Sequence, residues 1–199
     1  VATPPGERAD GITGKCLVMI TPDAERTMNT FLGISETVSV AELHPPAVAA
    51  SQYAYIEGYL VSSPTGRAAA IALREQAEAK GVKTALSLSD PAMVEFFHEG
   101  LVEMLGDGVD LVFCNQAEAL SFTRTSTVEA AVVELKKVAR GFALTLGAEG
   151  ALVVDGDQSW RIDPYKVDAV DTNGAGDMFA GAFIYAITHG YSFEQAGKL

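Results

Sequence analysis

The chain has 199 residues and a formal net charge of −12, with 48% hydrophobic and 20% charged residues, which is typical of a globular protein of one large domain or two small ones. Its 14 Lys and Arg residues are scattered along the sequence. Because binding to a nucleic-acid backbone needs clustered positive charge, we expect no nucleic-acid partner. An anionic ligand would have to be held locally, by backbone amides, a metal ion or a single arginine.

The two cysteines, Cys16 and Cys114, are far apart and form no metal or redox spacing, so they predict reduced thiols in a cytoplasmic protein. The three histidines are equally dispersed and indicate no zinc site. No apolar run approaches the roughly 18 residues of a membrane-spanning helix, so we expect no membrane partner.

The first part of the chain predicts a small β-hairpin that is set apart from the rest. Residues 1–14 carry proline, glycine and mixed charge and should be irregular. The stretch KCLVMITPDAERTMNTFLG then predicts two strands, at about 15–21 and 27–32, joined by a turn at Pro22-Asp23. A proline-rich stretch, HPPAVAAS, separates this hairpin from the next predicted strand.

From residue 52 onward, predicted strands alternate with predicted helices. The strands are expected at 52–59, 83–89, 110–115, 141–147, 151–156 and 158–163, and the last two form a hairpin across Asp155-Gly156. The helices are expected at 63–81, 91–105, 116–123, 127–139 and 178–190, with a final helix capped at Ser192. The pattern predicts an α/β fold, with a mostly parallel sheet covered by helices on both faces and ligand loops at the carboxyl ends of the strands.

The stretch DTNGAGDMFAGAF, residues 171–183, begins the longest apolar helix with two glycines and an aspartate. Since almost every residue after Met178 is apolar, we expect this helix to be buried. Glycine in a helix costs up to about 1 kcal/mol relative to alanine, so Gly174 and Gly176 need a backbone reason. The first amides of a helix lack intrahelical partners and attract anions, and two glycines leave those amides bare.

Asp177 follows these glycines in the first helical turn. One interpretation is an acidic residue that complements the helix dipole. The other is a general base that accepts a proton from a hydroxyl attacking a phosphoryl group held by the amides, which is the arrangement of a kinase. The glycine spacing lacks the third glycine of a dinucleotide-binding fingerprint, and no P-loop motif occurs in the chain.

Two further motifs occur in order. Asn115 and Glu118 form an N-x-x-E at the end of a predicted strand, and residues 145–150 read T-L-G-A-E-G, a T-x-G-x-x-G pattern. Together with D-T-x-G-A-G-D at residues 171–177, they resemble the ribokinase-like, or PfkB-type, carbohydrate and nucleoside kinases. The resemblance implies a ribokinase-like α/β fold with a β-hairpin lid, and ATP and Mg²⁺ as cofactors.

The resemblance also implies a role for each matching residue. Asp177 would be the base, and the amides of Gly174, Ala175 and Gly176 would hold the transferring phosphoryl oxygens. Asn115 and Glu118 would place Mg²⁺ through water, although Glu118 could instead be a solvated first-turn acid. The nucleotide would contact the remaining motif residues: Thr145, Gly147, Gly150, Asp171 and Thr172. A plain hairpin connection at 145–150 and an Asx turn at Asp171 remain the alternatives.

The predicted hairpin resembles the lid of members close to the adenosine kinases, in which an arginine reaches the active site. Arg26 matches that arginine and would offset charge on the transferring group, unless it is a solvent-facing turn residue. The resemblance divides the chain into a lid segment, residues 1–44, and a nucleotide-binding kinase core, residues 45–199. It also allows a homodimer formed through the lid.

The resemblance covers only the middle and later part of the family domain. The parts that in relatives bind the acceptor sugar and enclose the adenine have no counterpart in these 199 residues. We therefore expect a fragment of a longer kinase, with an uncovered apolar face, that is neither stable nor active by itself.

The sequence favours an ATP-dependent kinase that phosphorylates a hydroxyl of a small molecule, with adenosine or a sugar with a primary alcohol as the favoured acceptor. A non-catalytic nucleotide or sugar sensor on the same fold is the alternative. A nicotinamide-dependent oxidoreductase is disfavoured because its glycine fingerprint is missing.

Overall fold

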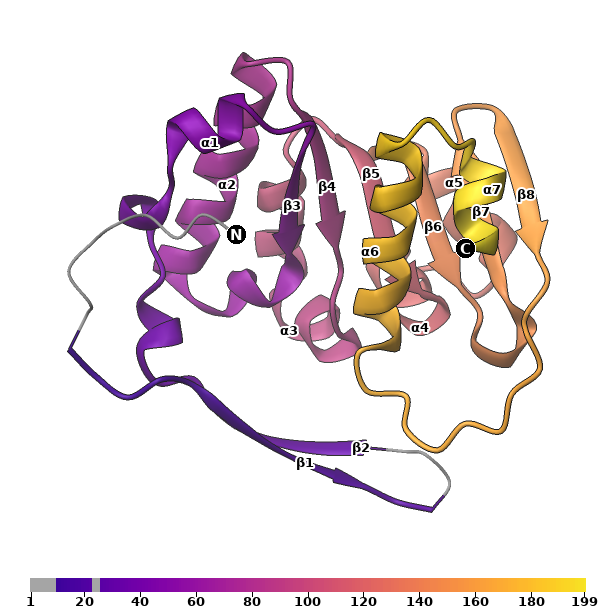
Figure 1. Ribbon diagram of the computed structural model, residues 1–199, viewed down its shortest axis with the longest axis horizontal. Coiled ribbons are helices and arrows are strands. Elements are labelled where there is room, and N and C mark those ends of the chain that lie inside the picture. The colour runs from indigo at the N-terminus through magenta and orange to yellow at the C-terminus, as the bar shows by residue number, and fades with distance from the viewer. Residues whose placement is uncertain (1–9, 23–25) are drawn as a thin grey trace.

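The computed structural model describes residues 10–22 and 26–199, which form two separate sheets (Figure 1). The larger sheet has six strands in the order β3-β4-β5-β6-β7-β8. Its first four strands are parallel, and the last two are antiparallel to their neighbours. The strands are β3 (Tyr53–Glu57), β4 (Lys83–Ser87), β5 (Val109–Asn115), β6 (Ala139–Thr145), β7 (Ala151–Asp155) and β8 (Gln158–Ile162). The predicted α/β fold with a mostly parallel sheet is confirmed.

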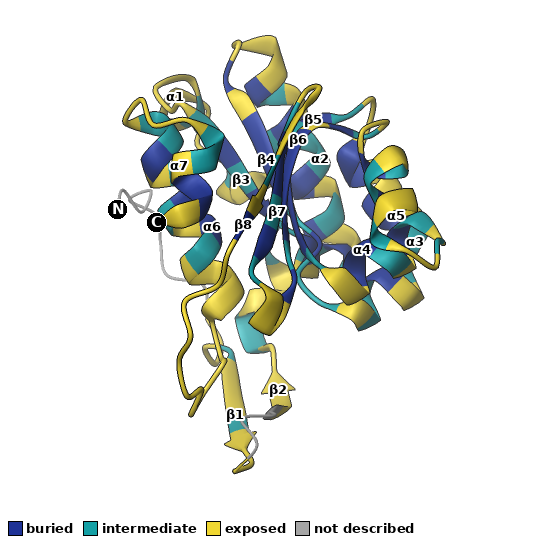
Figure 2. Cartoon of the chain, turned by 90° about the vertical axis from the view of Figure 1, so that its right-hand side faces the viewer, coloured by how far each residue is buried: buried dark blue, intermediate teal, exposed yellow. Residues whose placement is uncertain are grey.

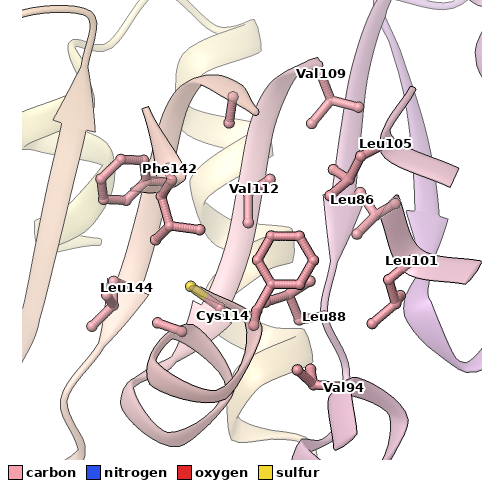
Figure 3. Close-up of a cluster of buried hydrophobic side chains, with 14 of the residues drawn as sticks. Leu86, Leu88, Val94, Leu101, Leu105, Val109, Val112, Cys114, Phe142 and Leu144 are labelled. Atoms are coloured by element: carbon pink, nitrogen blue, oxygen red, sulfur yellow. The ribbon is translucent and has the colours of Figure 1, made fainter. Parts of the chain in front are cut away.

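Helices cover both faces of this sheet (Figure 2). One face is covered by α2 (Pro64–Ala79), α3 (Pro91–Leu105), α4 (Gln116–Thr123) and α5 (Val128–Leu135). The other face is covered by α6 (Ala175–Thr188) and α7 (Phe193–Lys198). Side chains of the strands alternate between the two layers. Leu86, Val112 and Phe142 pack toward α2–α5 (Figure 3), whereas Leu111 and Phe113 pack toward α6 and α7.

The helix starts follow local capping signals. Ser63 accepts a hydrogen bond from the amide of Gly66 at the start of α2, and Asp90 accepts one from Ala92 at the start of α3. Both helices have proline at their first position, where the missing amide proton costs nothing. The final helix begins after Ser192, as predicted.

Several predicted boundaries differ from the structure by two or more residues, and two of them show the effect of the surroundings. The strand expected at 52–59 ends at Glu57, and residues 58–62 form a 3-10 helix, η3 (Gly58–Ser62). The helix expected at 127–139 ends at Leu135, and Ala139 already belongs to β6, because it pairs with Val109 of β5. Pairing with β5 satisfies the backbone amide and carbonyl groups at the start of β6, and a local helical pattern does not reveal this pairing.

The prediction that the apolar helix α6 is buried is correct for one face only. Ala180, Phe183 and Ala186 are buried against the sheet. Met178 and Tyr185 point away from it and are 75% and 56% exposed. Among the described residues no element covers this outer face, so an apolar sequence here does not imply burial on all sides.

The smaller sheet is the predicted hairpin, formed by β1 (Lys15–Ile20) and β2 (Arg26–Phe31), which pair antiparallel with Lys15 opposite Phe31. It extends beneath the carboxyl ends of the parallel strands (Figure 1). The chain then passes through η1 (Gly33–Thr37), η2 (Val40–Glu42) and α1 (Pro45–Ala49), all of which contact α2. The division at residue 44 stays a prediction. None of the helices in the described ranges has the length and apolar character needed to cross a membrane.

Candidate active site

A cleft of about 1080 Å³ opens at the carboxyl ends of the parallel strands, between the hairpin and the first turn of α6. It brings together nine of the twelve residues that the sequence analysis singled out: Asn115, Glu118, Thr145, Gly147, Thr172, Gly174, Ala175, Gly176 and Asp177. Gly150 and Asp171 do not line it. Arg26 begins β2, but its side chain lies outside the part of the chain that the structure describes.

The first turn of α6 presents bare backbone amides to this cleft. Gly174 caps the helix in the left-handed region, with φ +73°, and no side chain caps the turn. The amide of Ala175 donates to the carbonyl of Thr172 at 3.2 Å, whereas no hydrogen bond within the described residues uses the amides of Gly176 and Asp177. A Cβ built on Gly176 would meet no atom within 4 Å. The space above the amides is therefore open, as an anion site requires.

Asp177 lies exposed in this first turn, on the wall of the cleft. Its carboxylate accepts no hydrogen bond from the described residues, so both oxygens can face a ligand. Its charge reaches the half-buried Tyr55 on the neighbouring strand β3. The pKa of the Tyr55 hydroxyl is raised mainly by burial, then by the carboxylate of Glu57, and in part by Asp177.

Asn115 and Glu118 form a reciprocal capping box at the start of α4. Asn115 Oδ1 accepts from the Glu118 amide at 2.9 Å, and the Glu118 carboxylate accepts from the Asn115 amide at 2.9 Å and from Nδ2 at 2.6 Å. Glu118 is only 5% exposed, so the alternative of a solvated acid is wrong. Burial, and then the Glu118 charge, raise the pKa of the adjacent Cys114 thiol.

The oxygen donors of this pair fit Mg²⁺ bound through water. Mg²⁺ prefers oxygen ligands and usually keeps several of its waters. Both Glu118 oxygens and Asn115 Oδ1 already take part in the capping box, so water-mediated contacts would leave the box intact. Within the described ranges, no group of three or more His, Cys, Asp or Glu side chains is arranged to hold a metal directly.

The two glycines of the T-x-G-x-x-G pattern lie in different surroundings. Thr145 ends β6 directly opposite Asn115 of β5, and Gly147 lines the cleft with φ +59° and open space around it. Gly150 has φ +88°, and a Cβ there would lie 2.0 Å from the carbonyl oxygen of Ile162. Gly150 therefore fits the alternative of a plain hairpin connection, whereas Gly147 lies where a ligand could reach it.

Asp171 makes the Asx turn that was its alternative interpretation, because its Oδ1 accepts from the Asn173 amide at 2.8 Å. It lines a smaller cavity of about 520 Å³ between the end of β1 and the loop before α6, together with Ile20, Thr21, Pro22, Ala169 and Val170.

The sequence analysis missed residues of the opposite wall of the cleft. Three come from β2 and the residue after it, and five from the segments at and beyond the ends of β3 and β4, including η3 and the start of α3: Met28, Thr30, Leu32, Tyr59, Ser62, Ser87, Ser89 and Met93. The predicted strand ends were the available signal, since ligand sites of parallel sheets lie there. No motif identified the individual side chains.

Comparisons with known proteins identify the family of this chain. Residues 7–199 match the model of the pfkB family of carbohydrate kinases. The chain is 33% identical to the adenosine kinase of Schizophyllum commune, over 92% of this chain and 59% of that protein. Among solved structures, adenosine kinase from Sinorhizobium meliloti has a TM-score of 0.90 at 35% identity, covering 94% of this chain and 58% of that one.

An Escherichia coli protein assigned as ribokinase II and solved with ATP and Mg²⁺ shares the fold, with a TM-score of 0.83 at 20% identity over 94% of this chain and 63% of that one. The chain thus spans about 60% of the length of the relatives it matches.

Proposed function

This chain belongs to the pfkB family of carbohydrate kinases, and on that premise we propose that it transfers the γ-phosphoryl group of Mg·ATP to a hydroxyl of a sugar or nucleoside, with adenosine or a primary-alcohol sugar favoured. One observation carries the proposal. The bare first turn of α6, the Asn115–Glu118 pair and the end of β6 all meet in one cleft.

Asp177 acts as the general base in this proposal. It takes the proton from the acceptor hydroxyl as the oxygen bonds to phosphorus, which in a loose transition state needs a well-placed base more than a strong one. The amides of Gly174, Ala175 and Gly176 hold the phosphoryl oxygens. The Ala175 amide donates to the Thr172 carbonyl at 3.2 Å, so this hydrogen bond must break before the amide can bind a phosphoryl oxygen.

The Asn115–Glu118 pair would hold the waters around Mg²⁺, and the metal ion would neutralise charge on the phosphates. Thr145, Gly147 and Thr172 contact the nucleotide along the cleft. We retain Gly150 and Asp171 as supports that shape the loops beside the nucleotide, since neither lines the cleft.

Arg26 is the proposed cation that offsets charge on the transferring group. Its support is position: β2 contributes Met28 and Thr30 to the wall of the same cleft. The hairpin would then act as the lid. A homodimer through the hairpin remains a prediction, supported by the exposure of Leu17 (65%) and Phe31 (56%).

The test is ADP release by the full-length protein from Mg·ATP, with a panel of adenosine, other nucleosides, ribose, fructose and 2-keto-3-deoxy sugars. We expect turnover with one acceptor class. Asp177→Ala should lower kcat by about 10²–10⁴-fold with little change in ATP affinity, and Asp177→Asn should behave in the same way. ATP binding without turnover would favour the sensor alternative, and a variant that retains most of its kcat would refute the role of Asp177.

A further inference from the structure

We propose that Ser89, held in place by Glu57, accepts a hydrogen bond from a hydroxyl of the acceptor and so determines acceptor specificity. The inference rests on the proposed phosphotransfer and names a residue that the sequence motifs do not include.

The ends of β3 and β4 approach each other closely. Glu57 is the last residue of β3 and Ser87 the last of β4, and the two face each other in the parallel ladder. Glu57 is followed by Gly58, where a Cβ would lie 2.5 Å from the Ser87 carbonyl oxygen and 2.8 Å from that of Leu88. Glycine therefore allows the backbone after β4 to pass directly beside the end of β3, within reach of the Glu57 side chain.

The backbone of Ser89 has an unusual conformation. It has φ +69° and is one of two non-glycine residues with positive φ in the described ranges. A residue with a Cβ adopts this region only at a conformational cost, and such residues concentrate at functional sites. Three hydrogen bonds hold it there. Its Oγ donates to Glu57 Oε2 at 2.9 Å and, more weakly, to the Ser87 carbonyl oxygen at 3.4 Å, and its amide donates to Ser87 Oγ at 3.1 Å.

The hydroxyl group of Ser89 acts as a donor toward Glu57. Because the hydroxyl proton of Ser89 points to a carboxylate, its oxygen is left to accept, and donation to an anionic group makes it a better acceptor. The neighbouring Tyr55 stays protonated, since burial and then the Glu57 charge raise the pKa of its hydroxyl. The Glu57 carboxylate thus accepts from Ser89 while Ser89 lines the cleft.

Ser89 lies in the same cleft as Asp177. The Tyr55 hydroxyl is near enough to Asp177 to experience its charge. A hydroxyl that donates to Ser89 would therefore belong to the molecule whose other hydroxyl loses its proton to Asp177. This selects a polyhydroxylated acceptor over one with a single alcohol.

The experiment measures acceptor KM, ATP KM and kcat for the full-length wild type and for Ser89→Ala, Ser89→Gly and Glu57→Gln. The acceptor is the one that turns over, for example adenosine, compared with its monodeoxy analogues such as 2′-deoxyadenosine and 3′-deoxyadenosine. Ser89→Gly removes the hydroxyl while relieving the positive φ, so it separates binding from folding. The matched control is Ser51→Ala, outside the cleft, whose hydroxyl donates to the Ala47 carbonyl at 2.8 Å.

We expect both Ser89 variants to raise the acceptor KM by about 3–10-fold, with ATP KM unchanged, and to lose the wild-type discrimination against one deoxy analogue. Glu57→Gln should have a smaller effect in the same direction, and Ser51→Ala none. If the Ser89 variants turn over but discriminate the analogues as the wild type does, this inference alone is overturned. If the wild type turns over no acceptor, the proposed function fails, and the inference fails with it.

Discussion

Replacing each glycine of the T-x-G-x-x-G turn by alanine should separate a residue that shapes the turn from one that faces the ligand. Gly150 has φ +88° and ψ −133°, a region open almost only to glycine, and an added Cβ would lie 2.0 Å from the Ile162 carbonyl oxygen and 3.0 Å from the Pro164 nitrogen. Both atoms belong to the backbone, so they cannot move aside as a flexible side chain can.

Strain and overpacking together should lower the free energy of unfolding of Gly150→Ala by about 2–6 kcal/mol. Gly147→Ala meets no atom within 4 Å and carries only the cost of a left-handed residue, about 1–2 kcal/mol. Since a native domain is stable by only about 5–15 kcal/mol, the difference is large enough to measure.

The assay is urea denaturation of the full-length variants, combined with ATP KM for those that fold. We expect Gly150→Ala to lose more free energy of unfolding than Gly147→Ala. Relative to that loss, Gly147→Ala should show the larger rise in ATP KM. Equal losses of stability in the two variants would refute the steric reasoning at Gly150.

Three further predictions concern the same cleft. Gly176→Ala should leave the free energy of unfolding unchanged or raise it by up to about 1 kcal/mol, because alanine favours a helix, yet it should lower kcat, since the methyl group would stand over the open amides. Asn115→Ala should cost about 1 kcal/mol of stability by removing the cap, and a Mg²⁺ titration of activity should show a raised requirement. The buried thiol of Cys114 has a raised pKa, so it ionises more readily in the unfolded chain; unfolding free energy should therefore fall as pH rises past the ordinary thiol value, and Cys114→Ala should reduce that dependence.

Each of these has a result that would contradict it. A Gly176→Ala enzyme with normal kcat would show that the amides do not approach the phosphoryl group. An Asn115→Ala enzyme with normal Mg²⁺ dependence would limit that residue to capping. For Cys114, alkylation at pH 8 should be slow compared with that of the exposed Cys16; equal rates would mean that the thiol is not buried in solution.

The sequence by itself determined the order of the elements and identified the three motifs. Strand and helix periodicity, Ser63 and Asp90 as caps, and the glycines before Asp177 are local signals, because hydrophobic alternation and capping depend on residues a few positions apart. The parallel strand pattern also placed the ends of β5 and β6, with Asn115 and Thr145, at one edge of the sheet. The first turn of α6 joins them in the cleft through the tertiary structure.

Only the tertiary structure decided which of these residues face a ligand and what lies opposite them. The burial of Glu118, the different surroundings of Gly147 and Gly150, and the contact between Glu57 and Ser89 join atoms of different elements. The early start of β6 and the open outer face of α6 likewise result from the elements that pack beside them. Register and packing set these distances, and no local pattern in the sequence contains them.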